Sequence, residues 1–198
     1  DELLRGGPAV FHLVLFVRIG HGRQHDARKV AAGSGKRFPY RQLRALVVAA
    51  VALSDEVEAI GAALQSLGLQ HDALEPGEDA GLISLTDGHV HFRHPLVRSA
   101  VYHAAAPSER RAAHRALAGA LRERDDSERF AWHLAGAAIS VDEEAAIALE
   151  RAADQARARS SYAAAAAALA RAASLTADED ARPRRLFAAA DAALNAGR

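Results

Sequence analysis

The chain has 198 residues, half of them apolar, and its 25 basic and 25 acidic side chains give a formal net charge of zero. This balance argues against a protein that binds nucleic acid through bulk positive charge. The absence of cysteine excludes disulfides and thiolate metal sites. Alanine dominates the second half and aromatic residues are few, which is typical of closely packed helices with small contacting faces. Because the chain starts at Asp1 and contains no methionine, we expect it to be a fragment of a longer protein.

Residues 1–40 are irregular in pattern. The apolar run at residues 8–17 is too short to span a membrane and lacks the flanking features of a secretory signal, so we expect a cytoplasmic protein without membrane contact. The segment GSGKR at residues 33–37 looks at first like a phosphate-binding loop. However, Val30 and Arg37 stand where a Walker A loop needs its first glycine and its hydroxyl, so we interpret it as a flexible basic loop.

Residues 41–104 begin with a helical pattern. Apolar spacing predicts helices at residues 41–53 and 55–68. The second should end at Gly68, because glycine readily adopts the left-handed conformation that closes a helix. A third, shorter helix is expected to have Asp72 as its N-cap.

A hairpin follows these helices. Two alternating apolar runs flank Asp87 and Gly88, the dipeptide that most strongly predicts a two-residue β-turn. Pro95 then suits the first turn of a further helix, which should end near residue 104. Three helices followed by a two-stranded hairpin are the order of a winged helix.

Residues 105–198 are helical throughout in pattern. A hydroxyl or acidic residue precedes each periodic segment, as helix N-termini require. The linkers are short, so neighbouring helices should pack as antiparallel pairs. The segment from Tyr162 to Leu175 resembles the first helix of a tetratricopeptide-like unit. The expected fold is therefore mainly α: an irregular segment at 1–40, a winged-helix module with a small β-hairpin at 41–104, and an α-helical repeat-like array at 105–198.

Histidines are concentrated at the end of the predicted hairpin. His89 and His91 would share one face of a strand, and His94 could approach them from the turn. Zinc prefers three or four convergent ligands with supporting partners, and the nearest carboxylate is Asp87 in the turn. We therefore expect no metal site and no cofactor in this chain.

Other chemistry is also disfavoured. The predicted recognition helix of the winged helix carries acidic residues, which repel DNA phosphates, so no direct nucleic-acid contact is expected. Ser99 and His103 are one helical turn apart, but no orienting acid or oxyanion loop accompanies them, so we expect no enzyme activity. The acidic residues of that helix are Asp72, Glu75, Glu78 and Asp79.

The most specific sequence motif in the chain is FRHPLVRSAVY at residues 92–102, which is followed by SERRAAHRALA at 108–118. Through these motifs, residues 43–198 resemble the large ATP-binding LuxR-family regulators of actinobacteria. These regulators belong to the signal-transducing ATPases with numerous domains. The resemblance implies an ATPase domain, a winged helix, a helical sensor array and a DNA-reading helix-turn-helix. This chain matches the winged helix and the start of the array. ATP or ADP would bind the ATPase domain of the longer protein, and that domain is the expected partner of this segment.

The resemblance also gives the FRHP motif a role. In related ATPases a winged-helix histidine reaches the phosphate of the bound nucleotide and holds the inactive state, and His94 resembles that residue, with Arg93 as a second candidate. A cationic or donor side chain just before a helix can bind an anion, and the helix dipole favours the same charge. The alternative is that Arg93 and His94 only join the hairpin to the next helix.

We therefore expect a non-catalytic regulatory and protein-interaction segment of a LuxR-type ATP-dependent transcriptional regulator. Its winged helix would relay the nucleotide state to a helical sensor array that binds an effector or partner protein. Two alternatives remain. One is a nucleotide-binding or hydrolysing protein that uses the basic loop at residues 33–37, and the other is a stand-alone DNA-binding winged helix.

Overall fold

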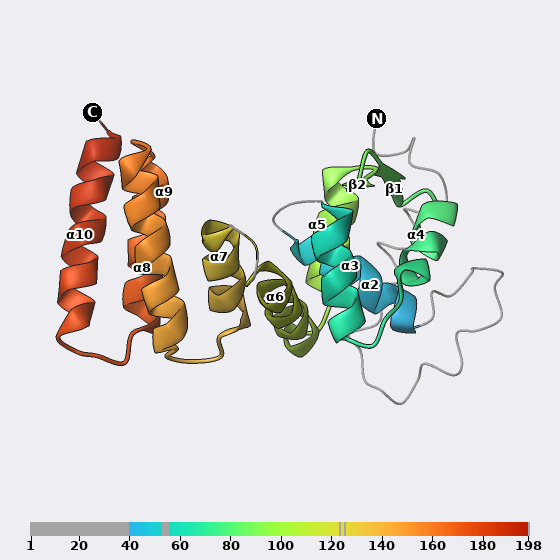
Figure 1. The fold of residues 1–198 in the computed structure, drawn as a ribbon, viewed down its shortest axis with the longest axis horizontal. Coiled ribbons are helices and arrows are strands. Elements are labelled where there is room, and N and C mark those ends of the chain that lie inside the picture. Colours follow the sequence, from blue (N-terminus) through green and yellow to red (C-terminus); the bar gives the residue numbers. More distant parts are fainter. Residues whose placement is uncertain (1–39, 53–55, 123, 125, 198) are drawn as a thin grey trace. The chain divides into compact units, whose positions relative to one another are not determined.

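The computed structural model describes residues 40–52, 56–122, 124 and 126–197 (Figure 1). Over these residues the chain is mainly helical with one two-stranded antiparallel sheet, which confirms the expected fold class at this level. The chain divides into two compact units, and the division between Ala113 and His114 falls within helix α6 (Pro107–Leu121). The predicted domain bounds stay predictions, and the basic loop at 33–37 lies outside the described residues.

The first unit is built around helix α2, whose residues 45–51 are all buried. Helix α5 packs against α2. Arg98 of α5 donates from Nε to the carbonyl of Ala50 at 3.1 Å and from Nη2 to the carbonyl of Ala52. The last carbonyls of a helix have no partner within it, so Arg98 satisfies them and complements the helix dipole. The elements of this unit before α6 are α2 (Tyr40–Val51), α3 (Val57–Ser66), η2 (His71–Leu74), α4 (Glu75–Asp79), β1 (Ile83–Thr86), β2 (His89–Phe92) and α5 (Pro95–Ala104).

Helix α3 ends as predicted at Gly68. This glycine has φ +70°, in the left-handed region, and its amide donates to the carbonyl of Gln65 at 2.9 Å. The next amide, of Leu69, donates to the carbonyl of Leu64 at 2.9 Å. These two bonds form a Schellman motif, which satisfies carbonyls at the helix end.

The third helical segment differs from the prediction. It is split into the 3₁₀ turn η2 and the short helix α4. Asp72 lies inside the first turn of η2, and Gln70 takes the N-cap position without a side-chain bond, so the predicted cap is wrong. Pro76 explains the split, because proline has no amide to continue a hydrogen-bond ladder from the preceding turn.

The hairpin has the predicted turn. Strands β1 and β2 pair from Ile83–Phe92 to Thr86–His89, and Asp87 and Gly88 have φ values of 54° and 76°. Two positive values are typical of the type I′ turn that joins two twisted strands. Ile83 and Val90 face the core and are buried. The opposite face is exposed and carries Ser84, Thr86, His89 and His91.

The second unit is a set of neighbouring helices in which α9 contacts both α8 and α10 (Figure 1). Its buried cluster consists of alanines and three larger side chains, Leu149, Leu169 and Leu175. Small contacting residues allow helix axes to approach closely. Asp142 caps α8 by accepting from the amide of Ala145 at 3.0 Å, as the acidic helix start predicted. Besides the second half of α6, the helices are α7 (Ser127–Ala137), α8 (Glu143–Ala158), α9 (Tyr162–Leu175) and α10 (Ala181–Ala196).

Among the described residues of the second unit, one charged side chain is buried. Arg185 of α10 is only 5% exposed, and its Nη2 donates to Glu143 at 2.8 Å and to Glu150 at 3.1 Å. The hydroxyl of Thr176 donates to the other carboxylate oxygen of Glu143 at 2.6 Å. The hydrogen bond from Thr176 has the largest effect on the pKa of Glu143, and the one from Arg185 the next largest. Both hold this pKa below its ordinary value. This network fixes α10 to two points along α8, which a hydrophobic contact alone would leave free to slide.

Helices α6 and α7 meet through two histidines. The Nδ1 atoms of His114 and His133 lie 3.0 Å apart, and His133 is only 1% exposed. A neutral imidazole carries one N–H and one acceptor nitrogen, so one ring donates and the other accepts. Gly136 of α7 makes room for this pair, because a Cβ there would lie 2.6 Å from the ring of His114.

This close approach predicts opposite effects for two glycine-to-alanine substitutions. Gly136→Ala should lower the free energy of unfolding by about 1 to 3 kcal/mol, because the His114 ring must leave its position. Gly119→Ala on α6 should raise it by about 0.5 to 1 kcal/mol, because nothing lies within 4 Å of the new methyl group and alanine favours a helix. Urea denaturation of both variants tests the pair, and equal effects would contradict the tight packing at Gly136.

Candidate functional site

Arg93 and His94 form the joint between β2 and α5. The amide of Arg93 donates to the carbonyl of Leu82 at 3.0 Å, which extends the hairpin ladder past the last strand residue. His94 is the N-cap of α5, with an extended backbone at φ −151° and ψ 143°. Both side chains are exposed. The hairpin and the helix together therefore hold the two predicted site residues at the surface.

The cap interaction of His94 determines which ring nitrogen is free. Its Nδ1 accepts a hydrogen bond from the amide of Leu96 at 3.1 Å. A nitrogen that accepts carries no proton, so the neutral ring has its proton on Nε2. The Nε2–H group is therefore a hydrogen-bond donor that can serve an anion.

The backbone at the start of α5 offers little to an anion. Pro95 has no amide hydrogen, the amide of Leu96 is bound by His94, and the amide of Val97 donates to the carbonyl of His94 at 2.9 Å. The start of α5 therefore offers an anion no free backbone amide among these three residues. Only the helix dipole would still favour a negative charge there. Any contact with a phosphate would be made by side chains.

Arg93 contributes the second donor group. Its Nη1 lies 3.7 Å from the point where a Cβ would stand at Gly81, a residue with φ +64°. Glycine is suited to this position because it adopts the left-handed conformation and leaves space beside the guanidinium. Arg93 forms no ion pair with any residue that the structure describes. Its side chain is exposed at the surface.

The three hairpin histidines do not form one cluster. His89 and His91 lie on the exposed face of β2 with ring centroids 6.0 Å apart, whereas the Nδ1 of His94 is directed to its own helix. Within the described ranges, no three histidine, aspartate or glutamate side chains converge as a metal site would need. The approach of His94 to the other two, considered from the sequence, is not seen.

The acidic surface predicted from the sequence is present. Its four carboxylate residues are all exposed on η2 and α4, and Glu78 also accepts from the amide of Leu85 at 3.2 Å. Ser99 and His103 are both exposed on α5, and the structure records no hydrogen bond between them. The four residues are Asp72, Glu75, Glu78 and Asp79.

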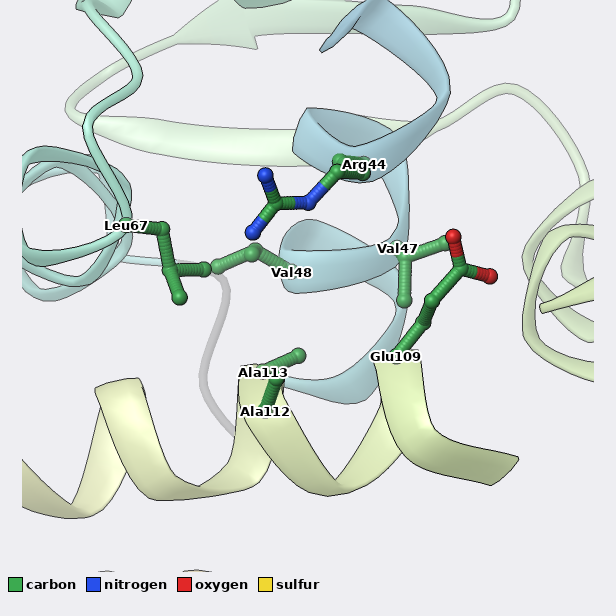
Figure 2. Close-up of a pocket in the computed structure, with 7 residues that line it drawn as sticks. All are labelled: Arg44, Val47, Val48, Leu67, Glu109, Ala112 and Ala113. Atoms are coloured by element: carbon green, nitrogen blue, oxygen red, sulfur yellow. The ribbon is translucent and has the colours of Figure 1, made fainter. Parts of the chain in front are cut away.

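A small hollow lies between α2 and the first half of α6 (Figure 2). Its volume is about 10 Å³, roughly the space that one water molecule needs. Glu109 at its edge accepts from the amide of Ala106 at 2.9 Å, so its carboxylate caps α6. The hollow is too small for a nucleotide or an effector. Its lining residues are Arg44, Val47, Val48, Leu67, Glu109, Ala112 and Ala113.

No family model, curated protein or solved structure matches the chain. The resemblance to LuxR-family ATP-binding regulators thus rests on the sequence motifs at residues 92–102 and 108–118. None of the described helices is both long and apolar enough to cross a membrane.

Proposed function

We propose that this chain is a non-catalytic regulatory and protein-interaction segment of a LuxR-type ATP-dependent regulator. Its first unit is a winged-helix module that relays nucleotide state, and its second unit is the start of a tetratricopeptide-like sensor array. ATP or ADP is the ligand of a separate ATPase domain, which this module contacts. The observation that carries the proposal is the pair of exposed donors, the Nε2–H of His94 and the guanidinium of Arg93, held at the joint between hairpin and helix.

The order of elements in the first unit supports a winged helix. Helices α2 and α3, the η2–α4 segment and the hairpin follow one another in the order expected of a winged helix. The segment in the place of the recognition helix is acidic and exposed, so it is unsuited to DNA phosphates. A module that contacts a protein domain fits this charge better than one that reads DNA.

The second unit supports a role in protein interaction. Helix α10 buries one face against α9 and exposes large apolar side chains on another. Leu186, Phe187 and Leu194 lie on the same side of the helix as Ala190, and Phe187 is 79% exposed. An exposed apolar stripe of this kind marks a surface that an amphipathic helix would cover. An effector or partner protein would bind the array here.

The joint can be tested with an ATPase domain of a LuxR-type regulator supplied in trans. The chain should bind the ADP-loaded domain more tightly than the ATP-loaded domain, because the joint donors favour the closed, inactive state. Arg93→Ala should weaken binding by about tenfold, since a charged hydrogen bond contributes roughly 1.5 kcal/mol or more. His103→Ala, which alters an exposed histidine on α5, should leave binding unchanged. Equal binding of both nucleotide forms by all three proteins would overturn the proposal.

The two alternatives predict different results for the chain alone. Calorimetric titration with ATP and ADP should show no binding, whereas micromolar binding that Lys36→Ala abolishes would indicate a nucleotide-binding loop. A gel-shift assay at physiological salt should show no complex, whereas salt-sensitive binding would indicate a DNA-binding winged helix.

A further inference from the structure

Two histidines lie close together on the exposed face of the hairpin. His89 and His91 lie two residues apart on β2, so their side chains project from the same face of the sheet. Their ring centroids are 6.0 Å apart and the rings are inclined by 31°. Both side chains are exposed, and the buried Val90 between them anchors the strand. The pair is therefore presented to solvent from a fixed backbone.

The hairpin turn determines the tautomer of His89. Its Nδ1 lies 2.8 Å from the carbonyl oxygen of Asp87. A carbonyl only accepts, so Nδ1 carries the proton and donates it, and in the neutral ring Nε2 keeps its lone pair. Metal-binding histidines usually have this arrangement, in which the second ring nitrogen donates to a backbone carbonyl or a carboxylate. The turn thus orients Nε2 of His89 as a ligand.

We propose that His89 and His91 bind one divalent late transition-metal ion through their imidazole nitrogens. With metal–nitrogen bonds of about 2.0 to 2.1 Å, two imidazoles on one tetrahedral ion have centroids roughly 5 Å apart. The observed 6.0 Å is close to this value, and a small rotation of either exposed ring closes the difference. Imidazole ligands suit zinc, nickel and copper ions rather than magnesium or calcium.

The site is open, unlike the closed zinc site that the sequence argued against. No third histidine or carboxylate converges on the pair among the residues described, so water would occupy the remaining coordination positions. Thr86 pairs with His89 and Ser84 with His91 across the hairpin, and Glu56 forms an isolated antiparallel bridge with His89 on its other side. The ion is therefore exchangeable, and its binding is independent of the anion contact assigned to the joint.

Cu²⁺ is the most sensitive probe, because it heads the affinity order of first-row divalent ions. The chain also contains His12, His21 and His25 outside the described residues, so the readout must resolve individual residues. Substoichiometric Cu²⁺ should broaden the assigned amide NMR signals of residues 89–91 before others in the first unit. The frozen complex should show electron paramagnetic resonance couplings to two imidazole nitrogens.

A matched pair of variants separates this site from general copper binding. His91→Ala removes one ligand and should weaken binding at the hairpin about a hundredfold, because the second imidazole acts at a high effective concentration. His103→Ala, an exposed histidine on α5, should leave the broadening at residues 89–91 unchanged. The proposal is overturned if Cu²⁺ does not broaden these signals, or if His91→Ala leaves the broadening intact. Cross-strand nuclear Overhauser contacts between Leu85 and Val90 in metal-free His91→Ala verify that the hairpin is still folded.

Discussion

Leu149→Ala should lower the free energy of unfolding of the second unit by about 3 to 4 kcal/mol. Leu149 is fully buried in the cluster formed by α7, α8, α9 and α10. Loss of a buried leucine removes its transfer energy and leaves a cavity. The surrounding side chains are mostly alanines, which cannot rotate into the space, so the effect should lie in the upper part of the usual range.

Ile147→Ala on the same helix is the matched control. Ile147 is 40% exposed, so its truncation should lower the free energy of unfolding by less than about 1 kcal/mol. Trp132 is the single tryptophan and packs against the buried cluster, so its fluorescence during urea denaturation reports on the second unit specifically. Similar losses for both variants would contradict the burial of Leu149 in this core.

Mild acid should also destabilise the second unit. Burial lowers the pKa of His133 to about 4, and the charges of His114 and Arg129 act in the same direction, while Asp126 opposes them. The ordinary pKa of histidine is about 6.5, so between these values the unfolded chain binds a proton that the folded chain does not. Stability is therefore fully present above about pH 6.5 and is lost progressively towards pH 4. From pH 7 to pH 5 the loss should be about 2 kcal/mol.

Two measurements test this origin of the acid sensitivity. In His133→Gln the side chain stays neutral at all pH values, so Trp132 fluorescence should show about 2 kcal/mol less stability loss between pH 7 and pH 5 than in the wild type. In the wild-type chain, the NMR titration of the His133 ring should give a pKa near 4. A titration midpoint at the ordinary value would contradict the burial of a neutral ring.

Local features of the fold were predictable from the sequence. The turn at Asp87 and Gly88 and the helix end at Gly68 depend on backbone conformations that few residues adopt, so nearby sequence specifies them. The prediction that Asp72 caps the third helix was wrong, because Pro76 divides this segment into a 3₁₀ turn that begins at His71 and a separate short helix. Where a short segment contains conflicting signals, packing against α2 and the hairpin decides its form.

The site was predictable only in part. Pro95 at the first helical position implies that the preceding residue is an N-cap, so the cap role of His94 was within reach of sequence reasoning. The tautomer of its ring and the position of Arg93 beside Gly81 depend on tertiary geometry. The same holds for the His114–His133 contact and for Arg98 at the end of α2, whose partners are 19 or more residues away in the chain. No local pattern marks such pairs.

The alanine core of the second unit makes the array vulnerable to ordinary mutation. A single base change in an alanine codon yields valine, threonine, serine, proline, glycine, aspartate or glutamate. At a fully buried site such as Ala146 or Ala153, each of these adds volume, buries a polar group or weakens the helix. An alanine core thus has no conservative missense neighbour, whereas a leucine core can change to isoleucine, valine or methionine. Close helix packing is obtained here at the expense of mutational tolerance.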